Sequence, residues 1–447
     1  KLKHSVTSLH DPAVLAAKAG TGFAKNLRHD IFEKIQGFSF ENVDRFSEAS
    51  LVTRLTTDIS NVQMAFMMII RTAIRCPLMF LFGTETEAVL RQTVNEIADG
   101  GNQMLTAESR HHADWYGPTW WRDLNIICDE AKKRNLKVVL FDDPWFPSQM
   151  MKGRVPVAFA ARMLQTEEMV DGQDVEAECL DEFVLAVEGT WTEQGFLPET
   201  LREVKGVWKR SVPGQKCYRF RAVPKGRLIN GFPREQFSVD GLSEAAVDWF
   251  IDYVYSRHYR EMRPYFDDGT IVGFFFDEPE THGDWGPALA AELERRGVDR
   301  VKALVAMKLK LAGGEEAAYR HAFMDARVET WGCVMYGRIS QWCQAHGVFF
   351  TGHFMEHAPV RRWFYGYEHC CGNVMQLLKY QDVPGVDLVC GQLFPGERAR
   401  WEHYQMPKIV SSIAHTYEKP GDRAMCEIFG AFGWAEGIPM MKQLTDH

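Results

Sequence analysis

The sequence predicts an α/β protein built around a parallel (β/α)-type barrel sheet, because short apolar runs alternate with amphipathic helical stretches from residue 84 onward. The clearest apolar run is IVGFFF at 271–276, and it leads directly into Asp277 and Glu278. An unbroken run rich in β-branched and aromatic residues is typical of a strand that is covered on both faces. Several other runs in the chain also end in charged residues, and barrels gather their reactive groups at the carboxyl ends of their strands.

The elements of this barrel follow one another along the chain. A helix begins at the capping residue Thr84 and ends at Gly100. The strands that follow are separated by helical stretches, except at about 151–240, where short alternating segments with Gly and Pro indicate a small antiparallel β insertion. The expected strands lie near 102–107, 137–142, 271–276, 348–353, 386–390 and 424–429.

An eight-stranded barrel needs two further strands. No convincing first strand precedes residue 84, and the apolar run at 78–82 would serve as one only by accident. The sequence ends inside the helix that follows the strand at 424–429, so the eighth strand is expected to be missing. We therefore expect an incomplete barrel with exposed strand edges.

The composition is that of an ordinary globular protein, with 46% hydrophobic and 25% charged residues. A formal charge of −9 argues against nucleic acid as the main partner. The ten cysteines form no CxxC pair, and the first residues have no apolar signal core. Free thiols in a reducing, cytoplasmic compartment are the expected state.

Residues 1–83 have a different character. They show helical periodicity with alternating charges and then an apolar stretch at 64–83, which contains Arg71, Arg75 and Pro77. Spanning a bilayer takes about 20 apolar residues, and a central arginine costs about 2.5 to 3.5 kcal/mol. The pattern alone favours an amphipathic soluble helix, and membrane association is expected only through 64–83.

The segments LRHDIFEKIQ, FENVDRFSEASLVTRLTTDISNVQ and MMIIRTAIRCPLM lie in residues 1–83. They resemble the cytoplasmic loop and the start of the next membrane helix in the transmembrane domain of an ABC exporter. No GxxxxGK[ST] phosphate-binding loop occurs in the chain. We therefore interpret residues 1–83 as a fused helical fragment without an activity of its own.

Five motifs of the barrel occur in the order LFDDPWFPS, GFFFDEPE, TGHFMEH, QDVPGVDLV and AMCEIFGAFGW. Together they resemble glycoside hydrolases of the α-L-rhamnosidase type, family 106 and its uncharacterised relatives, over residues 84–447. The β insertion falls where those proteins also expand. The resemblance implies a TIM barrel that cleaves a glycosidic bond, usually at L-rhamnose or a related sugar.

Glycoside hydrolysis needs a carboxylic acid that protonates the leaving oxygen and a second carboxylate opposite it. Glu278 is the candidate acid, because the adjacent Asp277 disfavours ionisation of its carboxyl group. Glu427 is the candidate second carboxylate, although it could instead be a structural group beside Trp434. Glu356 is the third catalytic candidate. It could replace Glu427 as the base or help to hold the sugar.

The remaining candidates are substrate-binding residues. Asp142 and Asp143 are expected to line the sugar pocket with Trp145 as a stacking platform, unless the two aspartates form a salt bridge to Arg110. His353 either holds the sugar or replaces Glu427 as the base, and Asp277 and Arg110 complete the set. No metal ligand is assigned, since HFMEH lacks the HExxH zinc spacing. The resemblance to rhamnosidases makes calcium the most plausible ion.

The leading hypothesis is thus a glycoside hydrolase acting on a carbohydrate, with an activity that the truncation leaves open. One alternative is a catalytically dead carbohydrate-binding barrel that keeps the aromatic platforms. A second alternative is a remnant of a membrane transport protein, motivated by residues 1–83. The sequence leaves the sugar, its linkage and the stereochemical outcome open, and only the family resemblance favours inversion.

Overall fold

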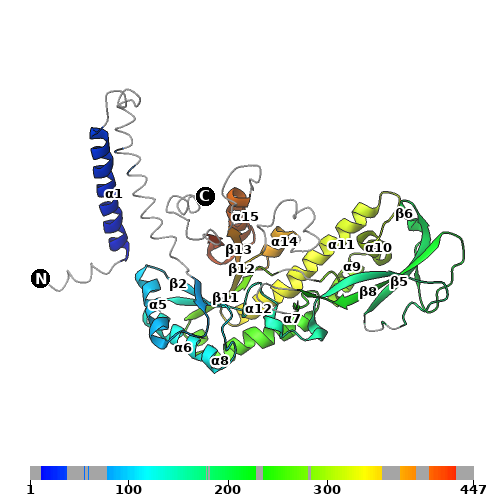
Figure 1. Ribbon diagram of the computed structural model, residues 1–447, viewed down its shortest axis with the longest axis horizontal. Helices are drawn as coiled ribbons and strands as arrows, with labels where there is room; N and C mark the ends of the chain where they lie inside the picture. Colours follow the sequence, from blue (N-terminus) through cyan, green and yellow to red (C-terminus); the bar gives the residue numbers. More distant parts are fainter. Residues whose placement is uncertain are drawn as a thin grey trace.

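A seven-stranded, wholly parallel sheet forms the centre of the fold in the computed structural model (Figure 1). The structure describes residues 12–37, 55, 59, 78–177, 179, 182–227, 235–279, 283–354, 373–388 and 402–428. In spatial order the strands are β1 (Leu78–Leu81), β2 (Met104–Ser109), β3 (Lys137–Phe141), β11 (Ile271–Asp277), β12 (Phe349–His353), β13 (Val383–Leu388) and β14 (Met425–Ile428).

Six of these strands confirm the strands expected from the apolar runs. The pairs β2–β3, β3–β11, β11–β12, β12–β13 and β13–β14 are all parallel. The largest displacement is at β13, which begins at Val383, three residues before the expected start at 386. Spatial order follows chain order, as in a (β/α) barrel.

The strand β1 corrects an expectation, because a strand does precede residue 84. Leu78 pairs with Thr106 of β2 and Leu81 pairs with Ser109. Met79 and Leu81 are buried in the main core, whereas Phe80 points the other way. The sequence analysis missed this strand because its apolar letters continue the apolar stretch before it, and only pairing with β2 distinguishes it.

The sheet is curled like half of a barrel and is covered by helices. Within the described residues β1 and β14 are its two edges, so these strands do not close into an eight-stranded TIM barrel. The helices that follow the strands are α5 (Glu87–Asp99), α6 (Pro118–Lys133), α7 (Glu244–Phe250), α8 (Arg257–Asp267), α9 (Pro287–Arg295), α10 (Arg300–Lys308), α11 (Glu316–Trp331), α12 (Arg338–Ala345), α14 (Val374–Leu378) and α15 (Glu402–Thr416). Two π-helical turns, η6 (Ile251–Ser256) and η7 (Gly332–Gly337), join α7 to α8 and α11 to α12.

The two faces of the sheet are distinguished by the two-residue period of its strands. On the outer face, side chains such as Phe274, Phe276 and Phe350 pack into the main core with the helices. On the inner face, Val139 and Phe275 belong to a smaller apolar cluster. The complete inner cluster contains Val139, Phe141 and Phe275, with Met104, Phe146, Val272, Phe349 and Met425 packed against it.

The expected β insertion is present between β3 and α7, and it extends to one side of the sheet (Figure 1). Its antiparallel strands are β4 (Arg162–Glu168), β5 (Phe183–Thr192), β6 (Gly195–Phe196), β7 (Arg202–Val204) and β8 (Gln215–Pro224), followed by the pair β9 (Gly226–Arg227) and β10 (Gln236–Phe237). One face of this sheet joins the main core through Leu185 and Phe220. The other face forms a small core of its own around Trp208.

The N-terminal helix α1 spans Pro12–Gln36. It is drawn apart from the sheet in Figure 1. None of the helices in the described part of the chain combines the length and apolarity that crossing a membrane requires. Most of the apolar stretch at 64–83 lies outside the described residues, which resume at Leu78.

Candidate active site

Charged side chains follow the apolar inner cluster at the carboxyl ends of five strands. By the two-residue period, Asp277 shares the inner face with Phe275, and Glu427 shares it with Met425. Strand register brings neighbouring charges together, because Asp277 is paired with His353 and Asp387 is paired with Glu427. The inner face is therefore apolar at its floor and charged at its rim.

The rim residues form one group, called here the carboxylate group. It contains Glu108 of β2, Asp277 and Glu278 at the end of β11, Asp387 of β13 and Glu427 of β14. Glu108, Asp277 and Asp387 are buried, while Glu278 is half-buried and the side chain of Glu427 is 26% exposed. The two residues accessible from solvent are thus Glu278 and Glu427, which the sequence analysis proposed as the catalytic pair.

His353 lies between these carboxylates. Its Nε2 atom is 2.9 Å from Oε2 of Glu427 and 3.5 Å from Oδ1 of Asp277. Burial alone would lower the pKa of His353, but the carboxylates of Asp387, Glu427 and Asp277 outweigh it and raise this pKa well above its usual value. The acidic groups around His353 therefore favour its imidazolium form at neutral pH.

Glu108 and Asp387 are site residues that the sequence analysis did not assign to the site. Nε of Arg110 lies 2.6 Å from Oε1 of Glu108, whose side chain is 1% exposed. Burial raises the pKa of Glu108 to about 8, with Arg110 opposing and the charges of Asp277 and Glu427 adding to the rise. Both residues stand at the ends of strands expected from the sequence; the further signal that assigns them to the site is the two-residue alternation, which puts them on the face of the apolar inner cluster.

The Asp277–Glu278 pair marks the end of β11. Burial raises the pKa of Asp277 to about 7; His353 opposes this rise, and Glu427 and Glu278 contribute to it. Glu278 has a φ of 42°, a left-handed conformation that is uncommon for a residue with a side chain and that recurs at functional sites. The chain turns sharply here, so Glu278 leaves the alternation of the strand while its carboxylate stays near His353 and Asp387.

Asp142 is not brought into the carboxylate group. It is fully buried, and its carboxylate accepts hydrogen bonds from Oγ of Ser148 at 2.7 Å and from the hydroxyl of Tyr255 at 2.6 Å. Tyr255 belongs to the π-helical turn η6 and packs in the main core. The contacts of Asp142 are therefore those of a structural residue that links β3 to the helical layer.

Asp143 and Trp145 lie in the loop after β3. Asp143 is buried and accepts a hydrogen bond from the backbone N–H of Met151 at 3.1 Å. The ring of Trp145 stacks on His111 at 3.7 Å, and the guanidinium of Arg110 lies 5.2 Å from its centroid. The ion pair considered for Arg110 with Asp142 or Asp143 is replaced by its contact with Glu108. Trp145 and Arg110 border the site on the β2–β3 side.

Two candidate residues, Glu356 and Trp434, lie outside the described residues.

The ligands that calcium needs can be compared with the donor atoms that are described. Glu278, His353 and Asp387 each offer one ligand atom within 4.8 Å of the others. Calcium takes six to eight oxygen ligands, whereas one of these three donors is an imidazole nitrogen. These residues do not fit calcium, and no step of the chemistry below involves an ion.

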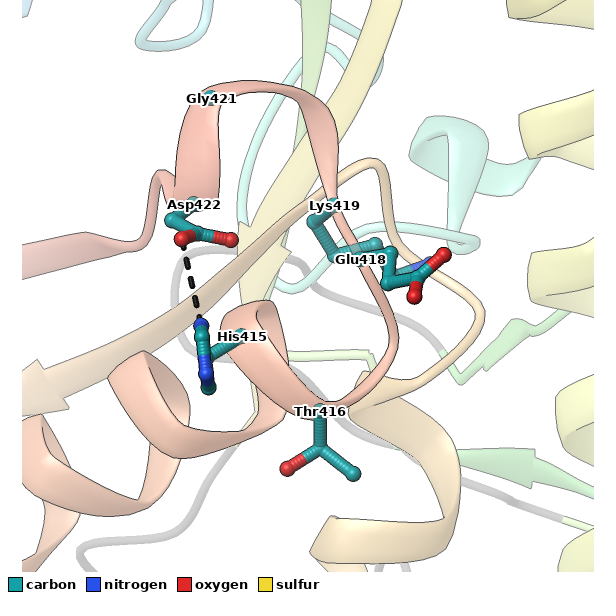
Figure 2. A pocket seen from close by; sticks show the side chains of 6 residues that line it. All are labelled: His415, Thr416, Glu418, Lys419, Gly421 and Asp422. Atoms are coloured by element: carbon teal, nitrogen blue, oxygen red, sulfur yellow. Dashed lines mark hydrogen bonds and ion pairs between the residues drawn. The ribbon is translucent and has the colours of Figure 1, made fainter.

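A separate hollow lies on the surface between α15 and β14 (Figure 2). It is lined by His415, Thr416, Glu418, Lys419, Gly421 and Asp422, and Nδ1 of His415 is 3.2 Å from Oδ2 of Asp422. These residues precede β14, so the hollow is at the amino end of that strand. It is thus at the opposite end of the sheet from the carboxylate group, and we assign no chemistry to it.

Comparisons with known proteins agree with this architecture. The structure is similar to that of a rhamnosidase from Novosphingobium sp. PP1Y, with a TM-score of 0.57 and 10% sequence identity. The similarity covers 79% of this chain and 52% of the rhamnosidase, so the chain spans about half of that protein. At this identity the likeness shows the fold alone, a barrel-like α/β fold shared with a glycoside hydrolase.

A second similarity concerns a short stretch. The chain is 40% identical over 68 residues to the uncharacterized ABC transporter ATP-binding protein YfiB of Bacillus subtilis (strain 168). This match covers 15% of the chain and 12% of the transporter protein. It supports in part the ABC-transporter resemblance, which was expected to occupy a stretch of comparable length. No family model matches the chain.

Proposed function

We propose that this protein is a glycoside hydrolase of the α-L-rhamnosidase type. The observation that carries the proposal is the carboxylate group, which collects acidic side chains from four strands at the carboxyl edge of a parallel sheet. In barrel enzymes this edge is where catalysis occurs. The similarity in fold to a rhamnosidase supports the same class.

In the proposed reaction Glu278 is the general acid and Glu427 is the general base. Glu278 donates its proton to the glycosidic oxygen as the bond from that oxygen to the anomeric carbon breaks. Glu427 accepts a proton from the water whose oxygen attacks the anomeric carbon. Both are the accessible members of the carboxylate group. Burial raises the pKa of Asp277 to about 7, so its charge disfavours ionisation of Glu278 mainly above that pH.

The remaining residues of the site would hold the sugar. Trp145 is half-buried at the border of the site, where His111 stacks on its ring and the guanidinium of Arg110 lies over it. Aromatic rings suit the apolar face of a sugar, and a guanidinium donates hydrogen bonds to its hydroxyl groups. We propose L-rhamnose or a related sugar as the substrate residue.

The test compares the wild-type protein with Glu278→Gln on a panel of chromogenic glycosides that begins with the α-L-rhamnoside. The amide keeps the shape of the side chain but has no acidic proton to donate, so turnover should fall by about 10²- to 10⁴-fold while binding of rhamnose, measured by calorimetry, is retained. Glu261→Gln, at an exposed position of α8, is the matched control and should leave turnover unchanged.

Three results would contradict the proposal in different ways. Wild-type turnover in Glu278→Gln would remove Glu278 as the acid. Sugar binding by the wild-type protein without any turnover would support the carbohydrate-binding barrel instead. Neither binding nor turnover across the panel would remove the carbohydrate assignment altogether.

A further inference from the structure

The feature that carries a further inference is the buried imidazole of His353. Its side chain is 2% exposed, and Nε2 contacts carboxylate oxygens of Glu427 at 2.9 Å and Asp277 at 3.5 Å. A ring nitrogen of His353 also lies within 4.8 Å of carboxylate oxygens of Glu278 and Asp387. Four carboxylates thus surround one imidazole.

The charges that face this imidazole come from every strand around it. Glu108 and Arg110 come from the end of β2, Asp277 and Glu278 from β11, Asp387 from β13 and Glu427 from β14. Arg110 is the second cation of this group, and its Nε is already paired with Glu108 at 2.6 Å. His353 is therefore the cation that offsets the other four acidic groups in the described part of the chain.

A general base must be ionised and correctly oriented before it can take a proton from water. Glu427 has acidic neighbours on three strands, Glu108 of β2, Asp277 of β11 and Asp387 of β13, and like charges favour the protonated form of a carboxyl group. A hydrogen bond from a charged donor has the opposite effect and also fixes one carboxylate oxygen. The 2.9 Å contact between Nε2 of His353 and Oε2 of Glu427 provides both the charge and the orientation.

We propose that His353 is a positioning residue whose imidazolium keeps Glu427 ionised and aimed at the attacking water. The role for Glu427 rests on the proposed function, whereas the charge state of His353 does not. Burial lowers the pKa of His353, but the carboxylates of Asp387, Glu427 and Asp277 raise it well above its usual value, which agrees with a cationic ring at the pH of the reaction. The sequence analysis placed His353 only among the residues that bind the sugar or replace the base.

The kinetic test uses His353→Asn, which removes the charge, and measures kcat and KM from pH 5 to pH 9. We expect kcat at pH 6 to fall at least tenfold, with KM changed less than threefold. The acid limb of the plot of kcat against pH should move up by about one pH unit, so that part of the activity returns at high pH. His415→Asn is the control, because His415 forms an exposed ion pair with Asp422. An equal loss at every pH would contradict the charge role and indicate a structural one.

A second measurement is independent of activity, and its first part uses only the wild-type protein. Nitrogen-15 NMR of the ring in histidine-labelled wild-type protein should show both nitrogens of His353 protonated up to at least pH 8. Glu427→Gln should lower the titration midpoint of His353. A neutral ring at pH 7, whether free or bound to a metal, would overturn the proposal. A persistent imidazolium in a protein that hydrolyses no glycoside would instead refute the proposed function and leave the charge state of His353 established.

Discussion

The carboxyl group of Asp142 gives the sharpest prediction about stability, because it is fully buried and has well-defined partners. Burial raises its pKa from 3.8 to about 7, although the hydroxyl donors Tyr255 and Ser148 oppose this rise. Each pKa unit is worth about 1.4 kcal/mol, so the difference between the folded and unfolded states corresponds to about 4 kcal/mol. This group therefore makes the folded state strongly dependent on pH.

The sign of this pH dependence follows from which state of the protein, folded or unfolded, binds the proton. Between about pH 4 and pH 7 the folded protein keeps the proton on Asp142 while the unfolded chain has released it. Stability falls with pH when the folded state binds more protons. Asp142 thus contributes stability that is fully present below about pH 4 and is lost as the pH rises through about 7.

Asp142→Asn removes this titration and keeps a polar group at the site, since the hydroxyls of Tyr255 and Ser148 can accept as well as donate hydrogen bonds. We expect the free energy of unfolding of the variant, relative to wild type, to increase by about 4 kcal/mol between pH 4 and pH 8. Urea unfolding followed by tryptophan fluorescence at several pH values measures this difference. Asp252→Asn, at a side chain that is 73% exposed, is the control.

Parallel stability curves for Asp142→Asn and wild type over this pH range would show that Asp142 is not a buried carboxyl group with a raised pKa. The same variant also tests the expectation that Asp142 lines the sugar pocket. Because its carboxylate is engaged by Tyr255 and Ser148, we expect rhamnose binding to be unchanged in the variant. A large loss of binding with unchanged stability would return Asp142 to the list of substrate-binding residues.

Three further predictions concern the sheet and the ion. Gly352→Ala would place a Cβ 2.1 Å from the carbonyl oxygen of Phe276. We expect this variant either to be insoluble or to lose at least about 3 kcal/mol of unfolding free energy in urea. The control Gly347→Ala, with open space around it, should lose only about 1 to 2 kcal/mol. Phe276→Ala empties a fully buried position and should lower the free energy of unfolding by about 3 to 5 kcal/mol. Phe80→Ala, at a partly exposed position, should lower it by less than about 1 kcal/mol. Equal losses would contradict the assignment of the two faces of the sheet. Removal of divalent ions with a chelator should leave Tm and turnover unchanged, because Glu278, His353 and Asp387 do not fit calcium. An increase of Tm in millimolar calcium would contradict this prediction.

Much of the sheet could be predicted because each strand carries its own local signal. The run at 271–276 is apolar at nearly every position, since both faces of β11 are covered, and it stops where the sheet edge meets charged groups. Strand β1 lacked such a signal. Its four residues continue a longer apolar stretch, and the contacts that make it a strand come from β2, whose paired residues lie 28 positions further along the chain.

The candidate site was only partly predictable for the same reason. Asp142 and Asp277 look alike in the sequence, since each follows an apolar run. In the structure Asp142 is held by a tyrosine of the helical layer, whereas Asp277 is paired in register with His353. Nothing local distinguishes the two, because the difference depends on which face of the sheet each carboxylate meets.

Local sequence is enough to locate the buried strands and the acidic residues that follow them, because apolar runs and chain-breaking residues act over a few neighbouring positions. Contacts between distant parts of the chain bring Glu108 and Asp387 into the site and place His353 against Glu427, 74 residues further along the chain. Strand register and the curl of the sheet set these distances. The protonation states also arise there, since burial and the charges of neighbouring strands act through space rather than along the chain.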